Sequence, residues 1–179
     1  MTIAGLGESG LLDTVFARFA TAAPLCSPVA LGPGDDAAYL RASGGVLLTT
    51  DTMVRGRDWH DRWSSPSDVG AKVVTQNLAD VAAMGGVGTA LLVTLVAPAS
   101  TTVSWVEDLV DGIARTASRA GARVAGGDLS SSGGGVSVSV TAVGDLPDGV
   151  SSPVLRSGMR PGDLLAVSGP LGRSAAGPA

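Results

Sequence analysis

The chain has 179 residues, of which 45% are hydrophobic and 3% aromatic, so it is long enough for one packed domain with at most the start of another. Its formal net charge of −4 argues against nucleic-acid binding, which depends on Lys and Arg neutralising phosphates. The single cysteine, Cys26, excludes an internal disulfide and is expected to be a small buried thiol. No apolar stretch reaches the ~20 residues that span a bilayer and no secretory leader is recognisable, so we expect a cytoplasmic protein without membrane contact.

The first half of the chain contains three predicted elements. Apolar residues at helical spacing predict an amphipathic helix over residues 9–22, ended by Ala23-Pro24. The apolar run from Val46 to Leu48 predicts a buried strand that delivers Thr49, Thr50 and Asp51 at its C-terminal end. A helix with Ser67 or Asp68 as its N-cap is expected to end at Met84, just before Gly85-Gly86.

The second half alternates strand and helix patterns. Capping-box spacing between Ser104 and Glu107 begins the clearest helix, which ends at Gly121. Strands are predicted over residues 89–97, 122–125, 136–143 and 164–168, and a flexible turn over 130–135. Together these elements predict an α/β fold of the α+β type, with a mixed sheet covered by helices.

The last residues suggest a boundary between two domains. Gly169 to Gly177 is a Gly-rich turn followed by small residues, which is typical of the beginning of a helix. We therefore expect residues 1–168 to form one domain and residues 169–179 to begin a second, truncated one.

Carboxylates fall at four separate points of the predicted fold: Asp35-Asp36 on a Gly/Pro turn, Asp51 after an apolar strand, Asp80 on a helix and Asp128 after Gly126-Gly127. Magnesium prefers hard oxygen ligands, and nucleotide enzymes reach it through a few carboxylates and the substrate phosphates. If each carboxylate lies at one edge of a sheet, the four points form a magnesium and nucleotide-phosphate site.

Each carboxylate also has an ordinary explanation. Gly-Pro-Gly-Asp-Asp is a common turn composition, Asp80 can face solvent, and Asp128 can cap the residues after it. Asp51 is harder to explain, because a carboxylate beside an apolar strand is costly to bury unless it is paired or binds a metal. No P-loop accompanies the only lysine, Lys72, and the single histidine, His60, builds neither a catalytic triad nor a histidine zinc site.

Five motifs occur in the order known from one family. They are Gly34-Asp35-Asp36-Ala37-Ala38, Thr50-Asp51-Thr52, Asn77 to Gly85, Gly126-Gly127-Asp128 and Arg156 to Asp163. Together they resemble the thiamine-monophosphate kinase family, within the superfamily of aminoimidazole ribonucleotide synthetase, selenophosphate synthetase and a hydrogenase maturation factor. The resemblance covers residues from about 30 to 177 and implies the N-terminal α/β domain of that superfamily, whose sheet pairs with its copy in a homodimer.

The resemblance also implies an activity and a set of site residues. The family transfers the γ-phosphoryl group of ATP to thiamine monophosphate, giving thiamine diphosphate. Magnesium ions around the ATP phosphates would be ligated by Asp36, Thr49, Thr50, Asp51, Asp80 and Asp128. Gly127 would approach the nucleotide through its backbone beside Asp128, and Arg156 would contact ATP.

Two departures from the family pattern affect the substrate side. Where the family has Val-x-Gly-x-His-Phe, this chain has Val54-Arg-Gly-Arg-Asp58-Trp59, so Asp58 occupies the substrate-contacting position. Whether Asp58 or the nearby His60 makes that contact stays open. The family's C-terminal domain, which contributes another aspartate and much of the thiamine pocket, is expected to be missing, and this piece alone is expected to be inactive.

Two alternatives remain beside the kinase. One is another ATP-dependent synthetase of the same superfamily, such as the purine-pathway enzyme, which shares the metal-aspartate design. The other is a non-catalytic fragment that binds Mg-ATP and dimerises.

Overall fold

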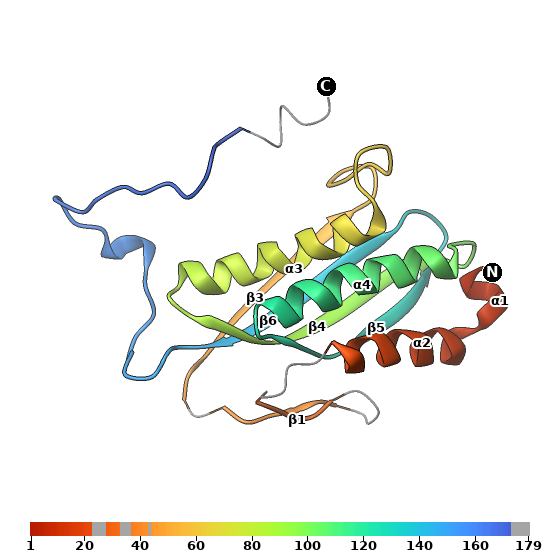
Figure 1. Cartoon of the computed structure of the whole chain (residues 1–179), viewed down its shortest axis with the longest axis horizontal. Coiled ribbons are helices and arrows are strands. Elements are labelled where there is room, and N and C mark those ends of the chain that lie inside the picture. Colours follow the sequence, from red (N-terminus) through yellow and green to blue (C-terminus); the bar gives the residue numbers. More distant parts are fainter. Residues whose placement is uncertain (23–27, 33–36, 43, 173–179) are drawn as a thin grey trace.

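A four-stranded sheet forms the centre of the molecule (Figure 1). The computed structural model describes residues 1–22, 28–32, 37–42 and 44–172. The strands are β3 (Val46–Val54), β4 (Val87–Pro98), β5 (Arg123–Ser132) and β6 (Ser137–Asp145), in the order β3-β6-β4-β5. Strand β6 is antiparallel to both neighbours, whereas β4 and β5 are parallel, so β3, β4 and β5 run in one direction. The predicted mixed sheet is confirmed, and β3 and β5 are its opposite edges.

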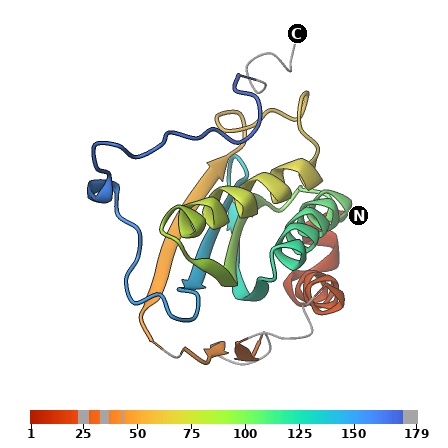
Figure 2. The same cartoon turned by 60° about the vertical axis from the view of Figure 1, so that its left-hand side comes forward.

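Helices cover one face of this sheet (Figure 2). They are α1 (Ile3–Leu6), α2 (Glu8–Thr21), α3 (Pro66–Ala83) and α4 (Val103–Arg119). Alternate residues of β6 point into the layer between sheet and helices, where Val138, Val140 and Ala142 are completely buried. This two-layer arrangement confirms the sheet covered by helices that the sequence predicts.

The helices approach one another closely because two glycines face the α3–α4 contact. A Cβ atom on Gly70 would lie 2.2 Å from the carbonyl oxygen of Leu109, and one on Gly112 would lie 2.1 Å from that of Ser67. Any side chain at either position would therefore separate the helices. Close packing of this kind fixes where α3 lies on the sheet.

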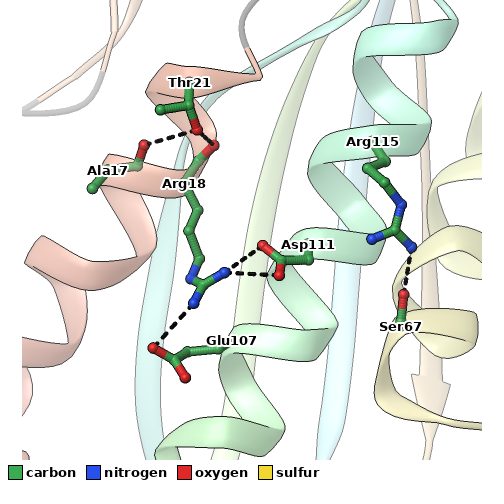
Figure 3. A network of polar contacts seen from close by, with 7 residues as sticks. All are labelled: Ala17, Arg18, Thr21, Ser67, Glu107, Asp111 and Arg115. Atoms are coloured by element: carbon green, nitrogen blue, oxygen red, sulfur yellow. Dashed lines mark hydrogen bonds and ion pairs between the residues drawn. The ribbon is translucent and has the colours of Figure 1, made fainter.

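Charged side chains tie the helices together at the surface (Figure 3). Arg18 of α2 donates two hydrogen bonds to the carboxylate of Asp111, at 2.6 and 2.7 Å, and pairs with Glu107 at 3.1 Å. These contacts raise the pKa of Arg18, with the Asp111 hydrogen bond as the main cause. Between α4 and α3, Arg115 donates to the hydroxyl of Ser67 at 2.6 Å.

The other face of the sheet is covered at one end only. There β1 (Val29–Leu31) pairs with β2 (Tyr39–Leu40), and Val29 packs on Ala90 and Ala125. Elsewhere on this open face, Leu48 and Leu92 are exposed. Hydroxyl groups lie between them: Thr141 donates to Thr50 at 3.0 Å, and Thr52 and Ser139 share a hydrogen bond of 2.7 Å.

Beyond Asp145 the described chain runs away from the sheet as an extended segment with one 3-10 turn, Arg156–Gly158. The strand predicted over residues 164–168 is wrong, since these residues pair with no other described strand. Leu164 and Leu165 expose 96% and 87% of their surface. A strand forms only when a neighbouring strand takes up its backbone hydrogen bonds, and apolar residues alone do not supply one.

Strands β3 and β5, which carry predicted ligands, both extend further along the chain than predicted. Strand β3 is an exposed edge and continues to Val54, so Asp51 lies within it and not at its end. Strand β5 continues through Asp128 to Ser132, which replaces the first half of the predicted turn. The sequence pattern predicts that each strand ends at its polar residues. In the structure, β3 continues its backbone hydrogen bonds with β6 beyond that point, and β5 does so with β4.

Helices α3 and α4 begin two or three residues earlier than expected. Ser65 caps α3 and Thr102 caps α4, in place of Ser67 or Asp68 and of Ser104. Helix α2 covers nearly all of the predicted range 9–22, and no helix of the described residues is both long and apolar enough to cross a membrane. The predictions for Ala23-Pro24, Cys26, Asp35, Asp36 and residues 173–179 lie outside the described residues.

The capping box of α3 predicts a pH-dependent contribution to stability. The Asp68 carboxylate accepts hydrogen bonds from the hydroxyl and amide of Ser65, at 2.6 and 2.9 Å, and these bonds lower its pKa. We expect Asp68→Ala to reduce the free energy of unfolding by about 1 kcal/mol. Because the folded-state pKa is lowered, the loss is complete above the unfolded-state pKa of about 3.9 and disappears as pH falls through the folded-state pKa.

Urea unfolding followed by circular dichroism between pH 7 and pH 2.5 measures this difference. The matched control is Asp108→Ala on α4, whose exposed carboxylate makes no hydrogen bond among the described residues. A loss at Asp68 that stays constant down to the lowest pH would contradict the capping role.

Candidate functional site

Two hydrogen bonds join helix α3 to the edge strand β3. The carboxylate of Asp51 accepts a hydrogen bond from Gln76 Nε2 at 2.9 Å, and the carboxylate of Asp80 accepts one from the hydroxyl of Thr49 at 3.1 Å. Residues two apart on a strand share a side, and residues four apart on a helix share a face. The helix runs antiparallel to the strand, so the two-residue step from Thr49 to Asp51 matches the four-residue step from Asp80 back to Gln76. Thr49, Asp51 and Asp80 therefore lie near one another.

The two carboxylates at this point carry uncompensated negative charge. The ion pairs of the described residues involve Arg18 and Arg55 and reach neither Asp51 nor Asp80. Each carboxylate uses only its Oδ2 atom in these hydrogen bonds, and Oδ1 has no hydrogen-bond partner among the described residues. Carboxylate and hydroxyl oxygens without a neighbouring cation suit a hard divalent ion, although no three acidic, His or Cys side chains cluster within the described part of the chain.

A wide cleft of about 1070 Å³ opens beside Thr49 and Asp80. Thr49 and Asp80 line one wall, and the extended C-terminal segment brings Arg156 to the other. The amide of Val154 donates to the carbonyl of Met84 at 2.9 Å, which fastens this segment to the end of α3. The structure thus brings three predicted site residues, Thr49, Asp80 and Arg156, to the lining of one cleft.

Asp128 lies on the opposite edge of the sheet. Its register partner on β4 is Thr94, which pairs with Ser139 of β6 and through it with Thr52 of β3. Asp128 is therefore level with Thr52 on the open face, three strand spacings or about 14 Å away, whereas Asp51 lies one residue earlier and faces α3. Because β3 and β5 are the opposite edge strands of the described sheet, Asp51 and Asp128 do not meet within one chain.

Around Asp128 the open face is hollowed to about 540 Å³. Gly126 and Gly127 form part of this hollow, and Ala37 and Ala38 close it from the turn that precedes β2. The carboxylate of Asp128 accepts a hydrogen bond from the hydroxyl of Ser130 at 2.9 Å. Asp36 lies outside the described residues. The described carboxylates among the predicted ligands fall into two groups, Asp51 and Asp80 beside α3 and Asp128 on β5.

Three other predicted residues have local partners. The hydroxyl of Thr50 faces the open side of β3 and donates to the carbonyl of Val140 at 3.1 Å. The carboxylate of Asp58 accepts from the amide of Val54 at 2.7 Å, and its carbonyl accepts from Lys72 at 3.0 Å, so Asp58 closes its own turn. The ring of His60 packs edge-on against Trp63, with centroids 5.0 Å apart. The metal role of Thr50 and the substrate role of Asp58 or His60 stay predictions.

Comparison with known proteins gives the family. The sequence matches the AIR synthase related protein, N-terminal domain, over residues 34–146. The chain belongs to this family. The match contains the first four of the five motifs, so the resemblance inferred from those motifs is confirmed at this level.

Several relatives of this AIR synthase domain carry one name. The thiamine-monophosphate kinase of Mycobacterium tuberculosis H37Rv is 47% identical over 177 residues, covering 98% of this chain and 51% of the relative. That of Corynebacterium glutamicum is 41% identical over 148 residues, covering 80% of this chain and 44% of the relative. The chain spans about half the length of the curated relatives it matches.

Solved structures agree with the sequence relatives. The thiamine-monophosphate kinase of Stenotrophomonas maltophilia K279a has a TM-score of 0.64 at 31% identity, covering 78% of this chain and 42% of that one. The structure of AaThiL complexed with AMPPCP and TMP has a TM-score of 0.53 at 30% identity, covering 80% and 43%.

Gly127 has a structural role that the sequence did not predict, and Gln76 is a site residue that it did not indicate. A Cβ atom on Gly127 would lie 1.8 Å from the carbonyl oxygen of Val93, so this glycine permits close pairing of β5 with β4 irrespective of any nucleotide. Gln76 was not singled out from the sequence, although it lies four residues before Asp80 on the same helix face. The four-residue spacing from Asp80 could have indicated Gln76, but only with knowledge that β3 lies beside this face of the helix.

The two neighbouring glycines of β5 provide a test of this packing. We expect Gly127→Ala to lower the free energy of unfolding by about 3 kcal/mol or more, because the methyl group collides with backbone that cannot move without breaking the β4–β5 ladder. Gly126→Ala is the matched control, since its Cβ would lie 3.6 Å from Leu92 Cδ2, and it should change stability by less than about 1 kcal/mol. Denaturant unfolding of both variants makes the comparison, and equal stabilities would contradict it.

Proposed function

We propose that this chain is the ATP- and magnesium-binding part of a thiamine-monophosphate kinase, which transfers the γ-phosphoryl group of ATP to thiamine monophosphate. The observation that carries the proposal is the cleft that Thr49, Asp80 and Arg156 line, in a chain 47% identical over 177 residues to a thiamine-monophosphate kinase. The complex of AaThiL with AMPPCP and TMP supports the same pair of substrates. The predicted homodimer and cytoplasmic location are part of this proposal.

The donor chemistry suits magnesium. Within the described part of the chain, Asp51 and Asp80 each keep one carboxylate oxygen without a hydrogen-bond partner, and neither forms an ion pair. Thr49 adds a hydroxyl. When bound, magnesium would neutralise charge on the ATP phosphates. Thr49, Asp51 and Asp80 would hold the ion on the β3 side, and the Arg156 guanidinium would bind a phosphate oxygen from the opposite wall.

Little covalent work is then required of the protein. Phosphoryl transfer depends mainly on holding donor and acceptor in line and on stabilising the charge between them. The acceptor, a phosphate group, needs no strong base to become a nucleophile. The chain's own task is to orient the phosphates of ATP, through Arg156 on one wall and the carboxylates on the other.

Residues beyond the sheet fit a longer protein. The extended segment of residues 146–172 exposes apolar side chains such as Leu164 and Leu165, and the matched relatives are about twice as long. Apolar side chains in such a row become stable when another layer covers them. We propose that the missing half covers this segment and supplies the thiamine side of the cleft, with the boundary near residue 168 as predicted.

The open face of the sheet supports the homodimer. Two copies that face each other through this surface would cover Leu48 and Leu92, with the sheets about 10 Å apart. If the twofold axis runs parallel to the strands, β3 of one copy lies opposite β5 of the other and residues keep their level along the strands. Asp128 lies on the open face, level with Thr52, so Asp128 of the partner subunit would lie beside β3 of the first copy and would add a carboxylate to the site from the open side of this edge strand.

The metal role of Asp51 is tested in the full-length enzyme. We expect Asp51→Asn to lower kcat for thiamine diphosphate formation about a hundredfold or more, because the metal would lose its anionic ligand. Circular dichroism and unfolding should be unchanged, since the amide can still accept from Gln76. Asp108→Asn on α4 serves as the control, and wild-type turnover by Asp51→Asn would overturn the assignment.

Sharing of the site between copies predicts complementation. Asp51→Asn and Asp128→Asn homodimers should each be inactive, but co-refolding them in equal amounts should restore about a quarter of wild-type activity. Half of the dimers are then mixed, and each mixed dimer has one intact site. If mixed dimers form, as seen with two affinity tags, and no activity returns, the shared site is refuted.

A further inference from the structure

Gln76 contacts a proposed metal ligand without being one. Its Nε2 donates to Oδ2 of Asp51 at 2.9 Å, from an exposed position on α3 one turn before Asp80. Its neighbours on the helix take no part in this contact: the hydroxyl of Thr75 donates to the Ala71 carbonyl, and the amide of Asn77 donates to the Val73 carbonyl. The Gln76 side chain is thus the only described group that holds the Asp51 carboxylate.

The donor at Asp51 is uncharged, as it is at Asp68 and Asp128, and differs from the guanidinium groups that hold other surface carboxylates. Arg18 holds Glu107 and Asp111, and Arg55 holds Asp61, so those carboxylates are fixed and neutralised together. At Asp51 an uncharged amide fixes the carboxylate and leaves its charge intact. Only an uncharged donor can orient an anionic ligand without competing with the cation that the ligand binds.

The same hydrogen bond selects one oxygen atom. With Oδ2 engaged by Gln76, Oδ1 of Asp51 is the atom left for a ligand, just as Oδ1 of Asp80 is left when its Oδ2 accepts from Thr49. A carboxylate fixed in this way has fewer orientations to lose when an ion binds.

We propose that Gln76 is a positioning residue that orients Asp51 for a divalent cation while leaving its negative charge unopposed. The inference rests on the proposed function, because it takes Asp51 as a metal ligand. It assigns to α3 a second contribution to the site beside Asp80.

The test is Mn²⁺ binding by this chain in the presence of AMPPCP, followed by electron paramagnetic resonance. Gln76→Lys should weaken Mn²⁺ binding about tenfold or more, because an ammonium group next to Asp51 opposes the cation. Gln76→Met keeps the length but not the donor, and should weaken binding about threefold. Thr75→Lys adds the same charge one residue away, directed elsewhere, and should weaken binding less than about threefold.

Urea unfolding separates this role from a merely structural one. The stability of Gln76→Met should stay near that of the wild type, because the contact lies at the surface. If Gln76→Met binds Mn²⁺ like the wild type, or if Gln76→Lys and Thr75→Lys weaken binding equally, the positioning role is overturned while the proposed function stands. If the wild-type chain binds no Mn²⁺ with AMPPCP, the metal site of the proposed function fails, and this inference fails with it.

Discussion

The position of α3 on the sheet is the constraint on which the candidate site depends. Asp51 and Asp80 belong to different elements and meet only because the helix crosses β3 at one register. That register is fixed by the α3–α4 contact, where Gly70 and Gly112 leave no room for a side chain. The buried side chains of Val73 and Val74 also fix it. A helix displaced by one turn would break both hydrogen bonds to β3.

The sequence contained the fold class and most elements, because these follow from local patterns. Period-two alternation in β6 and the apolar stripe of α4 can be read without knowing any partner. Strand ends could not be read in this way, since β3 and β5 continue past their polar residues for as long as a neighbour offers hydrogen bonds. The same reason explains why residues 164–168 looked like a strand without being one here.

The sequence predicted which residues belong to the candidate site but not how they are grouped in space. Carboxylates at Asp51, Asp80 and Asp128 are visible as departures from apolar surroundings, and their grouping depends on strand order, which no local pattern encodes. The order β3-β6-β4-β5 inserts two strands between Asp51 and Asp128. Gln76 was missed for a related reason: an exposed glutamine on a helix carries no signal until the strand beneath it is known.

Helix α3 also carries the one polar side chain that is buried among the described residues. Asn77 is completely buried, its amide donates to its own helix at Val73, and its Oδ1 atom has no hydrogen-bond partner. An unpaired buried acceptor costs about 1–3 kcal/mol, which an apolar side chain at this position would avoid. Asn77 therefore does not serve the packing of α3. The helix stabilises the fold through its valines and glycine, whereas Asn77, one turn before Asp80, is a cost to that packing, consistent with a segment shaped by what binds beside β3.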